Sequence, residues 1–411
     1  MIMWTKKTNP AVILARIRDC ATVRDGDKIE YAGFEIYKYE ADLLALISWP
    51  DSVARGERRG VLAVALRECL LSSTLNEENL LPSIREVASR HVSHAPREFI
   101  FVTSMTIPAS PRIRWRRNQG VQLSFPSRVP ARFARSREIL RPLLDTGVEP
   151  WPLGFAPVLV KGKAKSPLRA GEAALDALDL LRAMWNLALN RRVAWRFPAS
   201  SPRPLNTILL GPVSTLHRPE GSLETESYWR DPMYPQTVHP SDLGSRWDEL
   251  LGTERWVRRH LRSVPYRSEL EAWLRQYCRA LDQVDPGNAF LQLWSLLERL
   301  STPANQYAEQ KVVVQRVLFL YKDKDYHREV LGTLRRLRND VVHYASPADD
   351  QDFRALELKG YVESLLLFHL GRGARFETLE QACEFLDLTQ DVAQLDSEIK
   401  LRRFARKHYV A

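Results

Sequence analysis

Apolar residues from Trp247 onwards recur every three to four positions, which is the spacing of one face of an α-helix. Pro286-Gly287, Pro303, the charged run from Lys322 to Asp325, and Pro347 interrupt this pattern, and residues of these kinds end helices. The pattern predicts helices at residues 256–281, 288–300, 308–321, 326–344, 353–370 and 379–386, followed by a basic tail at 400–408. We therefore expect residues 246–411 to form an α-helical domain.

The first 165 residues mix two periodicities. Phe99 to Val102 and Val121 to Phe125 are rich in β-branched and aromatic residues, and the second segment alternates apolar and polar positions as a half-buried strand does. Residues 60–71 and 77–91 have helical patterns. The stretch from Lys161 to Pro167 is polar, basic and closed by proline, which is typical of an exposed linker. We predict an α+β N-terminal domain at residues 1–165.

A connector separates these two regions. Leucine, alanine and tryptophan residues recur at helical spacing over residues 171–196, whereas residues 198–240 are rich in proline, serine and glycine with short extended segments such as Asn206 to Leu210. Residues 166–245 are therefore predicted to hold one helix and an inserted β-hairpin or long loop. The predicted fold class is α+β, with a mixed N-terminal domain before a helical bundle.

The charge balance points to polyanionic partners. Lysine and arginine outnumber aspartate and glutamate, giving a net charge of +10. Such a balance favours nucleic acid first and an anionic membrane surface second through long-range attraction. No apolar run approaches the roughly 18 residues of a membrane-spanning helix, and the first residues do not resemble a secretory signal. The expected location is cytoplasmic, without membrane insertion.

Several kinds of site are excluded by spacing. Cys20, Cys69, Cys278 and Cys383 are scattered without a C-x-x-C pair, which argues against a zinc module. His91 and His94 have no further ligand nearby and are interpreted as surface histidines. The chain contains no G-x-S-x-G or G-x-x-x-x-G-K-[ST] motif, so serine hydrolase and nucleoside triphosphatase functions are disfavoured.

Arginines are concentrated between residues 112 and 141, with aromatic residues between them. The alternation of Arg112, Arg114 and Arg116 places these side chains on one face if the segment is a strand. Together with Arg117 they are candidates for contacting an RNA backbone, and the aromatic rings are candidates for base stacking. Alternatively, this stretch is a solvated strand face followed by an arginine-rich helix start.

The hexapeptide Arg338-Asn339-Asp340-Val341-Val342-His343 stands at the end of a helical apolar pattern, and Trp294 to Glu298 forms a W-x-x-L-E core in the segment 288–300. These features resemble the R-N-x-x-x-H signature and the preceding helix of the Apea-like branch of HEPN domains, the higher eukaryote and prokaryote nucleotide-binding superfamily. The resemblance covers residues 247–388. One departure is that Leu334 stands where some HEPN toxins carry a glutamate.

The resemblance implies an endoribonuclease that needs no metal or other cofactor. Histidine can exchange a proton with the attacking 2′-hydroxyl, and arginine can stabilise the charge that develops on phosphorus. His343 and Arg338 are expected in these roles. Asn339 lies four residues before His343, on the same helical face, and is expected to orient the imidazole or contact phosphate. Glu298 is a candidate cleft residue.

Family members complete such a site by dimerising, so a homodimer through the helical domain is expected here. The resemblance further implies a regulated effector of antiphage defence (abortive infection), in which the N-terminal domain has a sensing or regulatory role and a phage-derived trigger is the partner. Alternatives are a toxin restrained by an antitoxin, or an RNA- or nucleotide-binding adaptor without catalysis. In a purely structural alternative, Arg338 pairs with a carboxylate and His343 caps the helix C-terminus.

Overall fold

The computed structural model describes residues 2–6, 8–24, 28–50, 52–53, 56–93, 95–144, 149–190, 203–231, 233–235, 238–303, 306, 309–344 and 351–409. Of residues 91–93, 143, 226–227, 340–344 and 351–352 it describes the backbone only. The chain divides into two compact units. Unit 1 comprises Met1–Phe101, Val160–Ala174 and Leu216–Glu226, and unit 2 comprises Val102–Leu159, Leu175–Thr215 and Ser227–Ala411.

Helices dominate unit 1. Its apolar core is contributed by α1 (Ala11–Cys20), α2 (Glu35–Leu46), α3 (Arg58–Leu71) and α4 (Glu77–Ser93), with Leu14, Leu43 and Leu62 among the fully buried side chains. Two short antiparallel pairs flank them: β1 (Met3–Trp4) with β4 (Ile47–Ser48), and β2 (Ala21–Arg24) with β3 (Lys28–Tyr31). The helices predicted at 60–71 and 77–91 are confirmed as α3 and α4.

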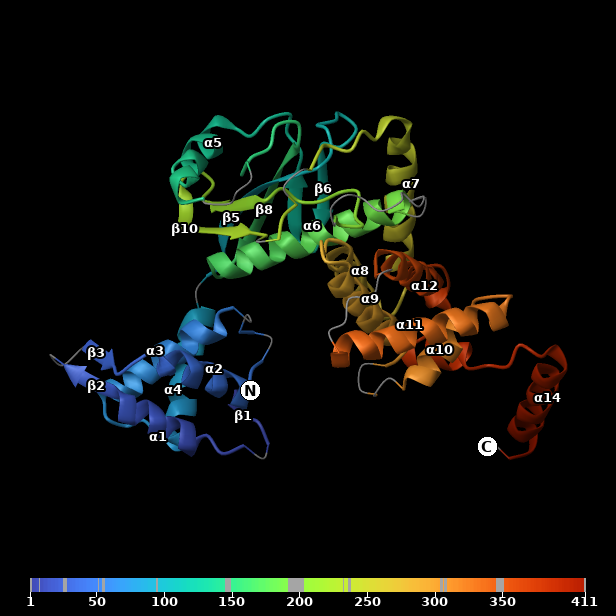
Figure 1. Cartoon of the computed structure of the whole chain (residues 1–411), viewed down its shortest axis with the longest axis horizontal. Helices are drawn as coiled ribbons and strands as arrows, with labels where there is room; N and C mark the ends of the chain where they lie inside the picture. Colours follow the sequence, from blue (N-terminus) through green and yellow to red (C-terminus); the bar gives the residue numbers. More distant parts are fainter. Residues whose placement is uncertain are drawn as a thin grey trace. The chain divides into compact units, whose positions relative to one another are not determined.

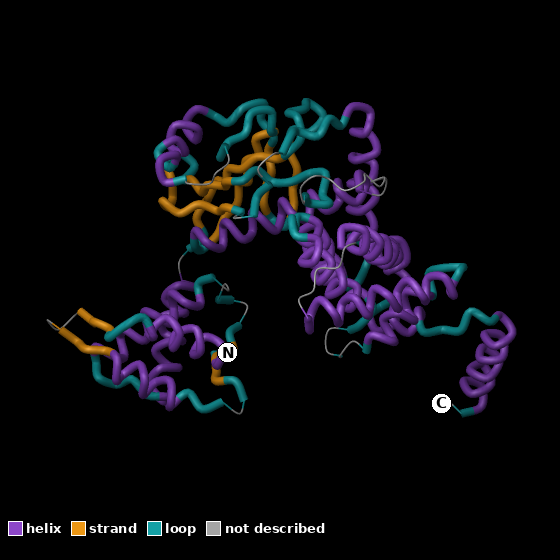
Figure 2. Tube along the Cα trace, in the orientation of Figure 1, coloured by secondary structure: helices purple, strands orange, loops and turns teal. Residues whose placement is uncertain are grey.

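One six-stranded sheet has the strand order β10-β9-β5-β8-β7-β6. The strands of the chain are orange in Figure 2. Its strands are β5 (Arg97–Met105), β6 (Trp115–Asn118), β7 (Val121–Ser124), β8 (Ala156–Ala164), β9 (Val213–His217) and β10 (Leu223–Arg230). Gln119 and Gly120 join β6 to β7 with positive φ angles of 47° and 81°, as a tight two-residue hairpin turn requires. The predicted strands at 99–102 and 121–125 are confirmed as parts of β5 and β7.

The predicted insertion forms a hairpin that extends this sheet. β9 and β10 lie within the proline-rich segment 198–240, and β9 lies beside β5 in the sheet. The extended segment at Asn206 to Leu210 forms no strand of its own, although Leu210 makes an isolated bridge to Met105. Between β7 and β8 the chain also forms α5 (Ala131–Glu138) and a 3-10 turn at Arg141–Leu143.

Helix α6 (Pro167–Asn190) is buried on all sides over its second half, because it has neighbours on opposite faces (Figure 1). On the sheet side, the Asn118 side chain donates to the carbonyl of Ala177, and the Trp185 ring lies 5.9 Å from that of Phe125. On the other side, Leu180 and Met184 belong to the core of the helical region. α6 thus joins the sheet to the helices that follow it.

The rest of unit 2 is a helical bundle. It contains α7 (Trp247–Leu261), α8 (Arg267–Leu281), α9 (Pro286–Leu300), α10 (Gln310–Leu318), α11 (Lys324–Tyr344), α12 (Gln351–Arg372), α13 (Leu379–Leu386) and α14 (Val392–His408), with 3-10 turns at Gly244–Arg246 and Gly373–Arg375. The α+β class with a helical C-terminal region is confirmed. The domain boundaries at 165 and 245 stay predictions.

Two details of the bundle differ from the sequence prediction. The single helix predicted at 256–281 was wrong, because the chain breaks into α7 and α8 around Pro265, whose ring and missing N–H are incompatible with a continuous helix. The basic tail is the second half of α14, whose start is capped by the Asp391 side chain accepting from the backbone N–H groups of Ala393 and Gln394. α14 has no buried residue.

A buried histidine makes the stability of the bundle depend on pH. His369 is fully buried, donates from Nε2 to the carbonyl of Leu300 at 2.8 Å, and accepts at Nδ1 from the Tyr266 hydroxyl at 3.0 Å. Burial lowers the pKa of His369 from 6.5 to about 4. In the unfolded chain this histidine is therefore protonated below pH 6.5, whereas in the folded chain it is protonated only below about pH 4.

The free energy of unfolding should fall by about 2 kcal/mol from this histidine alone between pH 7 and pH 5. Urea unfolding at the two pH values measures the loss. His369→Gln should remove this part of the pH dependence, whereas His239→Gln, at an exposed position, should retain it. An equal pH dependence in wild type and His369→Gln would show that the imidazole is not responsible.

Candidate active site at the end of helix α11

Helix α11 is fixed by one apolar face. Leu331 and Leu334 are fully buried in the bundle core, and Leu337 packs against it. Arg338 and Asn339 follow directly and are half-buried. The helical backbone continues to Tyr344 and so includes His343, but the side chains from Asp340 to Tyr344 lie outside the described residues. The role of His343 therefore stays a prediction.

The side chains of Arg338 and Asn339 contact one another and a residue of helix α10. Asn339 Oδ1 accepts from Arg338 Nη1 at 3.3 Å and from Gln310 Nε2 at 3.4 Å, both long hydrogen bonds. Because the oxygen is occupied by two donors, the amide Nδ2 of Asn339 is the group left to donate to a ligand. Gln310 begins α10 and was not identified from the sequence, since nothing in its surroundings marks it as functional.

Arg338 has no carboxylate partner among the residues that the structure describes. Its guanidinium bonds only to Asn339 there, and the neighbouring Arg336 bonds only to the Thr333 hydroxyl at 3.1 Å. Arg335 has no described ion-pair partner either. In the described part of the chain, an ion pair is thus found for none of Arg335, Arg336 and Arg338.

Glu298 is held by its own helix. Trp294 Nε1 donates to Glu298 Oε1 at 2.8 Å, one turn away on α9, and Glu298 is half-buried. Among the described contacts, Glu298 forms neither a hydrogen bond nor an ion pair with Arg338 or Asn339. The W-x-x-L-E segment on α9 and the R-N-x-x-x-H segment on α11 therefore belong to one helical bundle, and no direct polar contact joins them among the described residues.

The expected row of arginines on a strand face was wrong. Strand β6 begins only at Trp115, so Arg112 and Arg114 precede it, and Arg116 and Arg117 alternate to opposite faces. The proline at position 111 and the turn that follows it keep this segment out of the sheet.

Two of these arginines are already paired with acidic residues of helix α7. Arg112 Nη1 lies 2.8 Å from Asp248, and Arg116 Nε lies 2.8 Å from the buried Glu254. Glu254 also accepts from Arg258 and from the Trp185 indole. Arg116 therefore stabilises the packing of β6 on α7, whereas Arg114 and Arg117 remain exposed.

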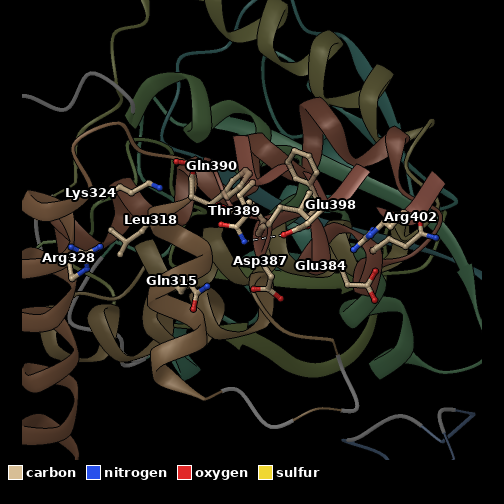
Figure 3. A pocket seen from close by; sticks show the side chains of 16 residues that line it. Gln315, Leu318, Lys324, Arg328, Glu384, Asp387, Thr389, Gln390, Glu398 and Arg402 are labelled. Carbon is tan, nitrogen blue, oxygen red and sulfur yellow. Dashed lines mark hydrogen bonds between the residues drawn. The ribbon is translucent and has the colours of Figure 1, made fainter. Parts of the chain in front are cut away.

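A groove of about 900 Å³ lies between α10, α13 and α14 (Figure 3). Leu318 and Phe385 contribute to its apolar surface, and its charged lining residues are of both signs, including Lys324, Arg402, Glu384 and Glu398. Lys324 starts α11, so Arg338 lies about 21 Å further along the helix at 1.5 Å per residue. The groove is therefore separate from the candidate active site, and its mixed charges do not favour a polyanion.

One cluster has the composition of a metal site. Ligand atoms of Asp179, Cys278 and Asp282 lie within 4.8 Å of one another. The Arg182 guanidinium binds both carboxylates, and burial raises the pKa of the Cys278 thiol well above its usual value. The cluster therefore already contains its cation, and the thiol is held in its neutral form.

Comparison with protein-family models, with curated proteins and with solved structures finds no match to this chain. None of the helices in the described ranges is both long and apolar enough to cross a membrane.

Proposed function

We propose that the chain is a metal-independent endoribonuclease of the HEPN type, acting as a regulated effector of antiphage defence. The observation that carries the proposal is the state of Arg338. Its guanidinium is half-buried, lies beside Asn339, and has no carboxylate partner among the described residues. A cation that is partly withdrawn from water and has no counter-charge among the described residues is suited to bind a phosphodiester and to stabilise negative charge that develops on it.

In the proposed reaction the 2′-hydroxyl of RNA attacks the adjacent phosphorus. His343 accepts the hydroxyl proton, the bond from oxygen to phosphorus forms, and the bond to the 5′-oxygen of the next nucleotide breaks. The leaving oxygen takes up a proton from a second acid. Arg338 binds the phosphoryl oxygens, and Asn339 Nδ2 is available to donate to them. The products are a 2′,3′-cyclic phosphate and a 5′-hydroxyl.

A second copy of the chain is part of this proposal. Arg338 and His343 lie five residues apart, which is about 140° around a helix, so one α11 cannot direct both toward the same phosphorus. A homodimer that brings two α11 ends together would supply the second acid. We further propose that the protein acts in the cytoplasm and that its N-terminal region keeps the ribonuclease inactive until a phage-derived trigger appears. In the alternative, a separate antitoxin inhibits the ribonuclease.

Incubation of the purified full-length chain with total cellular RNA in EDTA tests the proposal. The expected result is that the wild-type protein cuts RNA equally well with and without EDTA. If the resting chain is inhibited, cleavage is expected only after addition of an extract of phage-infected cells. RNA binding without cleavage under all these conditions, including phage-infected extract, would favour the non-catalytic adaptor instead.

A further prediction concerns which cations bind RNA. Helix α14 is exposed along its length, and Lys400, Arg402, Arg403, Arg406 and Lys407 have no ion-pair partner among the described residues. Replacing these five with glutamine should weaken RNA binding and flatten the slope of log K against log salt by up to about 3.5.

The matched control is the double variant Arg112→Gln and Arg116→Gln. These side chains are held by Asp248 and Glu254, so the slope should change by less than about one. Filter binding or fluorescence anisotropy at several salt concentrations measures both variants. If the control variant changed the RNA affinity and the salt slope more than the α14 variant did, the proposal that the α14 cations bind RNA would be contradicted.

A further inference from the structure

A small cavity in unit 2 lies between α6, the segment 204–214 and residues 229–231 and 234–235. Its volume is about 220 Å³, and its lining includes Arg182, Asp282, Tyr234, Trp229, Pro204 and Pro212. Pockets for drug-sized ligands measure about 300–1,000 Å³. A single ring system is therefore the size of occupant that this cavity fits.

Arg182 brings an unused hydrogen-bond donor to the cavity. The side chain is buried, and a guanidinium has five N–H donors. Nη1 donates to Asp282 Oδ1 and to the carbonyl of Ile208, and Nη2 donates to Asp179 Oδ1 and Asp282 Oδ2, at distances from 2.5 to 3.3 Å. The fifth donor, Nε–H, has no partner among the described residues. An unsatisfied buried donor of this kind costs free energy unless a ligand binds it.

Tyr234 brings a second unused polar group. Its hydroxyl is buried and has no hydrogen-bond partner in the described part of the chain. The hydroxyl interacts electrostatically with Arg182 and Asp282, and burial raises the pKa of Tyr234 well above its usual value. The phenol is therefore neutral and able to donate. Two donors from α6 and from the segment after β10 thus line the same cavity.

Asp282 supplies an acceptor beside these donors. Its Oδ1 accepts from Arg182 and from Asn206 Nδ2, whereas Oδ2 accepts, among the described residues, only from Arg182 Nη2. A carboxylate has about four acceptor positions, so one position on Oδ2 is unused. The Asp282 side chain retains 23% exposure and lines the cavity.

The charges argue for a neutral ligand. Arg182 already binds two carboxylates, those of Asp179 and Asp282, so its positive charge is matched within the protein. A phosphate would find no uncompensated cation on Arg182, and a cation would meet its guanidinium. The other two charged residues of the lining, Arg230 and Asp231, bring one charge of each sign, so they do not shift the balance toward an ion. The indole of Trp229 and the nearby prolines provide apolar walls of the kind on which a flat ring packs.

We propose that this cavity binds a neutral planar ring with an amide edge, a ring carbonyl next to a ring N–H, as in uracil and guanine. The carbonyl oxygen accepts from Arg182 Nε–H and from the Tyr234 hydroxyl, and the ring N–H donates to Asp282 Oδ2. The inference does not depend on RNA cleavage, because the cavity is built from residues distinct from Arg338 and Asn339.

Isothermal titration of the full-length chain with four nucleosides tests the inference. Uridine and guanosine carry the amide edge and should bind, whereas adenosine and cytidine lack a ring N–H beside a ring carbonyl and should bind at least about tenfold more weakly. Equal binding of all four, or no binding of uridine and guanosine at about 1 mM, would overturn the proposal.

Tyr234→Phe locates the binding. The variant keeps the ring and removes a hydroxyl that has no described partner, so folding should be unaffected and the affinity for uridine or guanosine should fall about tenfold. Tyr326→Phe, at an exposed position on α11, is the matched control and should bind as wild type does. Nucleoside binding that is unchanged in Tyr234→Phe would place the ligand elsewhere and overturn the assignment.

Discussion

Arg338→Ala is expected to cleave RNA about 10²–10³-fold more slowly than wild type, the usual cost of removing one group that stabilises transition-state charge. The fold should be retained, because the Arg338 side chain is half-buried and its one described hydrogen bond, to Asn339, is long. Cleavage rates under single-turnover conditions, together with thermal unfolding of each variant, measure the two effects separately.

Arg336→Ala is the matched control for this prediction. Arg336 stands on the same helix, is exposed, and bonds to the Thr333 hydroxyl, so its loss should change the cleavage rate by less than about threefold. Arg338→Lys should remain impaired, because an ammonium cannot reproduce the two-pronged binding of a phosphate by guanidinium. Wild-type cleavage by Arg338→Ala would remove Arg338 from the proposed site.

Arg182→Met is expected to lower the free energy of unfolding by about 3–5 kcal/mol, the largest stability effect that the described ion pairs predict. The substitution leaves the largely buried Asp282 without its cation, whereas the buried Asp179 retains Arg279, whose Nε lies 2.6 Å from Oδ2. These residues connect α6 to α8, so the loss falls on the junction between the sheet and the bundle. Urea unfolding followed by circular dichroism measures the change.

An exposed ion pair provides the comparison. Arg328 bonds to Asp325 on the surface of α11, and Arg328→Met should change the free energy of unfolding by no more than about 1 kcal/mol. The double variant Arg182→Met with Asp282→Asn should recover part of the loss, since it leaves one fewer unpaired buried charge. A loss in Arg182→Met no larger than that in Arg328→Met would show that the buried cluster does not stabilise the junction.

Local signals in the sequence were sufficient for most helices. Helix α9 is an example, because the apolar period predicted a helix at 288–300; the structure extends its start to Pro286, in the first turn, with Asp285 accepting from the backbone N–H of Asn288. The error at residues 256–281 came from following the apolar period across Pro265. The position of the β9–β10 hairpin in the sheet could not be predicted, because it depends on pairing with β5, more than a hundred residues earlier.

Side-chain contacts between distant segments limited the prediction of the sites. Arg112 and Arg116 have favourable spacing for phosphate binding, yet their partners Asp248 and Glu254 stand 136 and 138 residues away. Gln310 joins Asn339 across 29 residues, and Arg182 meets Asp282 across 100. Such pairs are created by tertiary packing, so a single sequence identifies the reactive residue types and not their partners.

The most direct test of the central claim is the chemistry of the RNA ends. Wild type and His343→Ala should be incubated in EDTA with two intact RNAs. The first contains a site that the wild-type protein cuts, and the second is the same RNA with a single 2′-deoxy nucleotide in place of the one whose 2′-hydroxyl would attack at that site. The account predicts 2′,3′-cyclic phosphate and 5′-hydroxyl ends from wild type only, and no cleavage at the 2′-deoxy position. Cleavage that requires a divalent metal, persists at the 2′-deoxy position, or is unchanged in His343→Ala would contradict it.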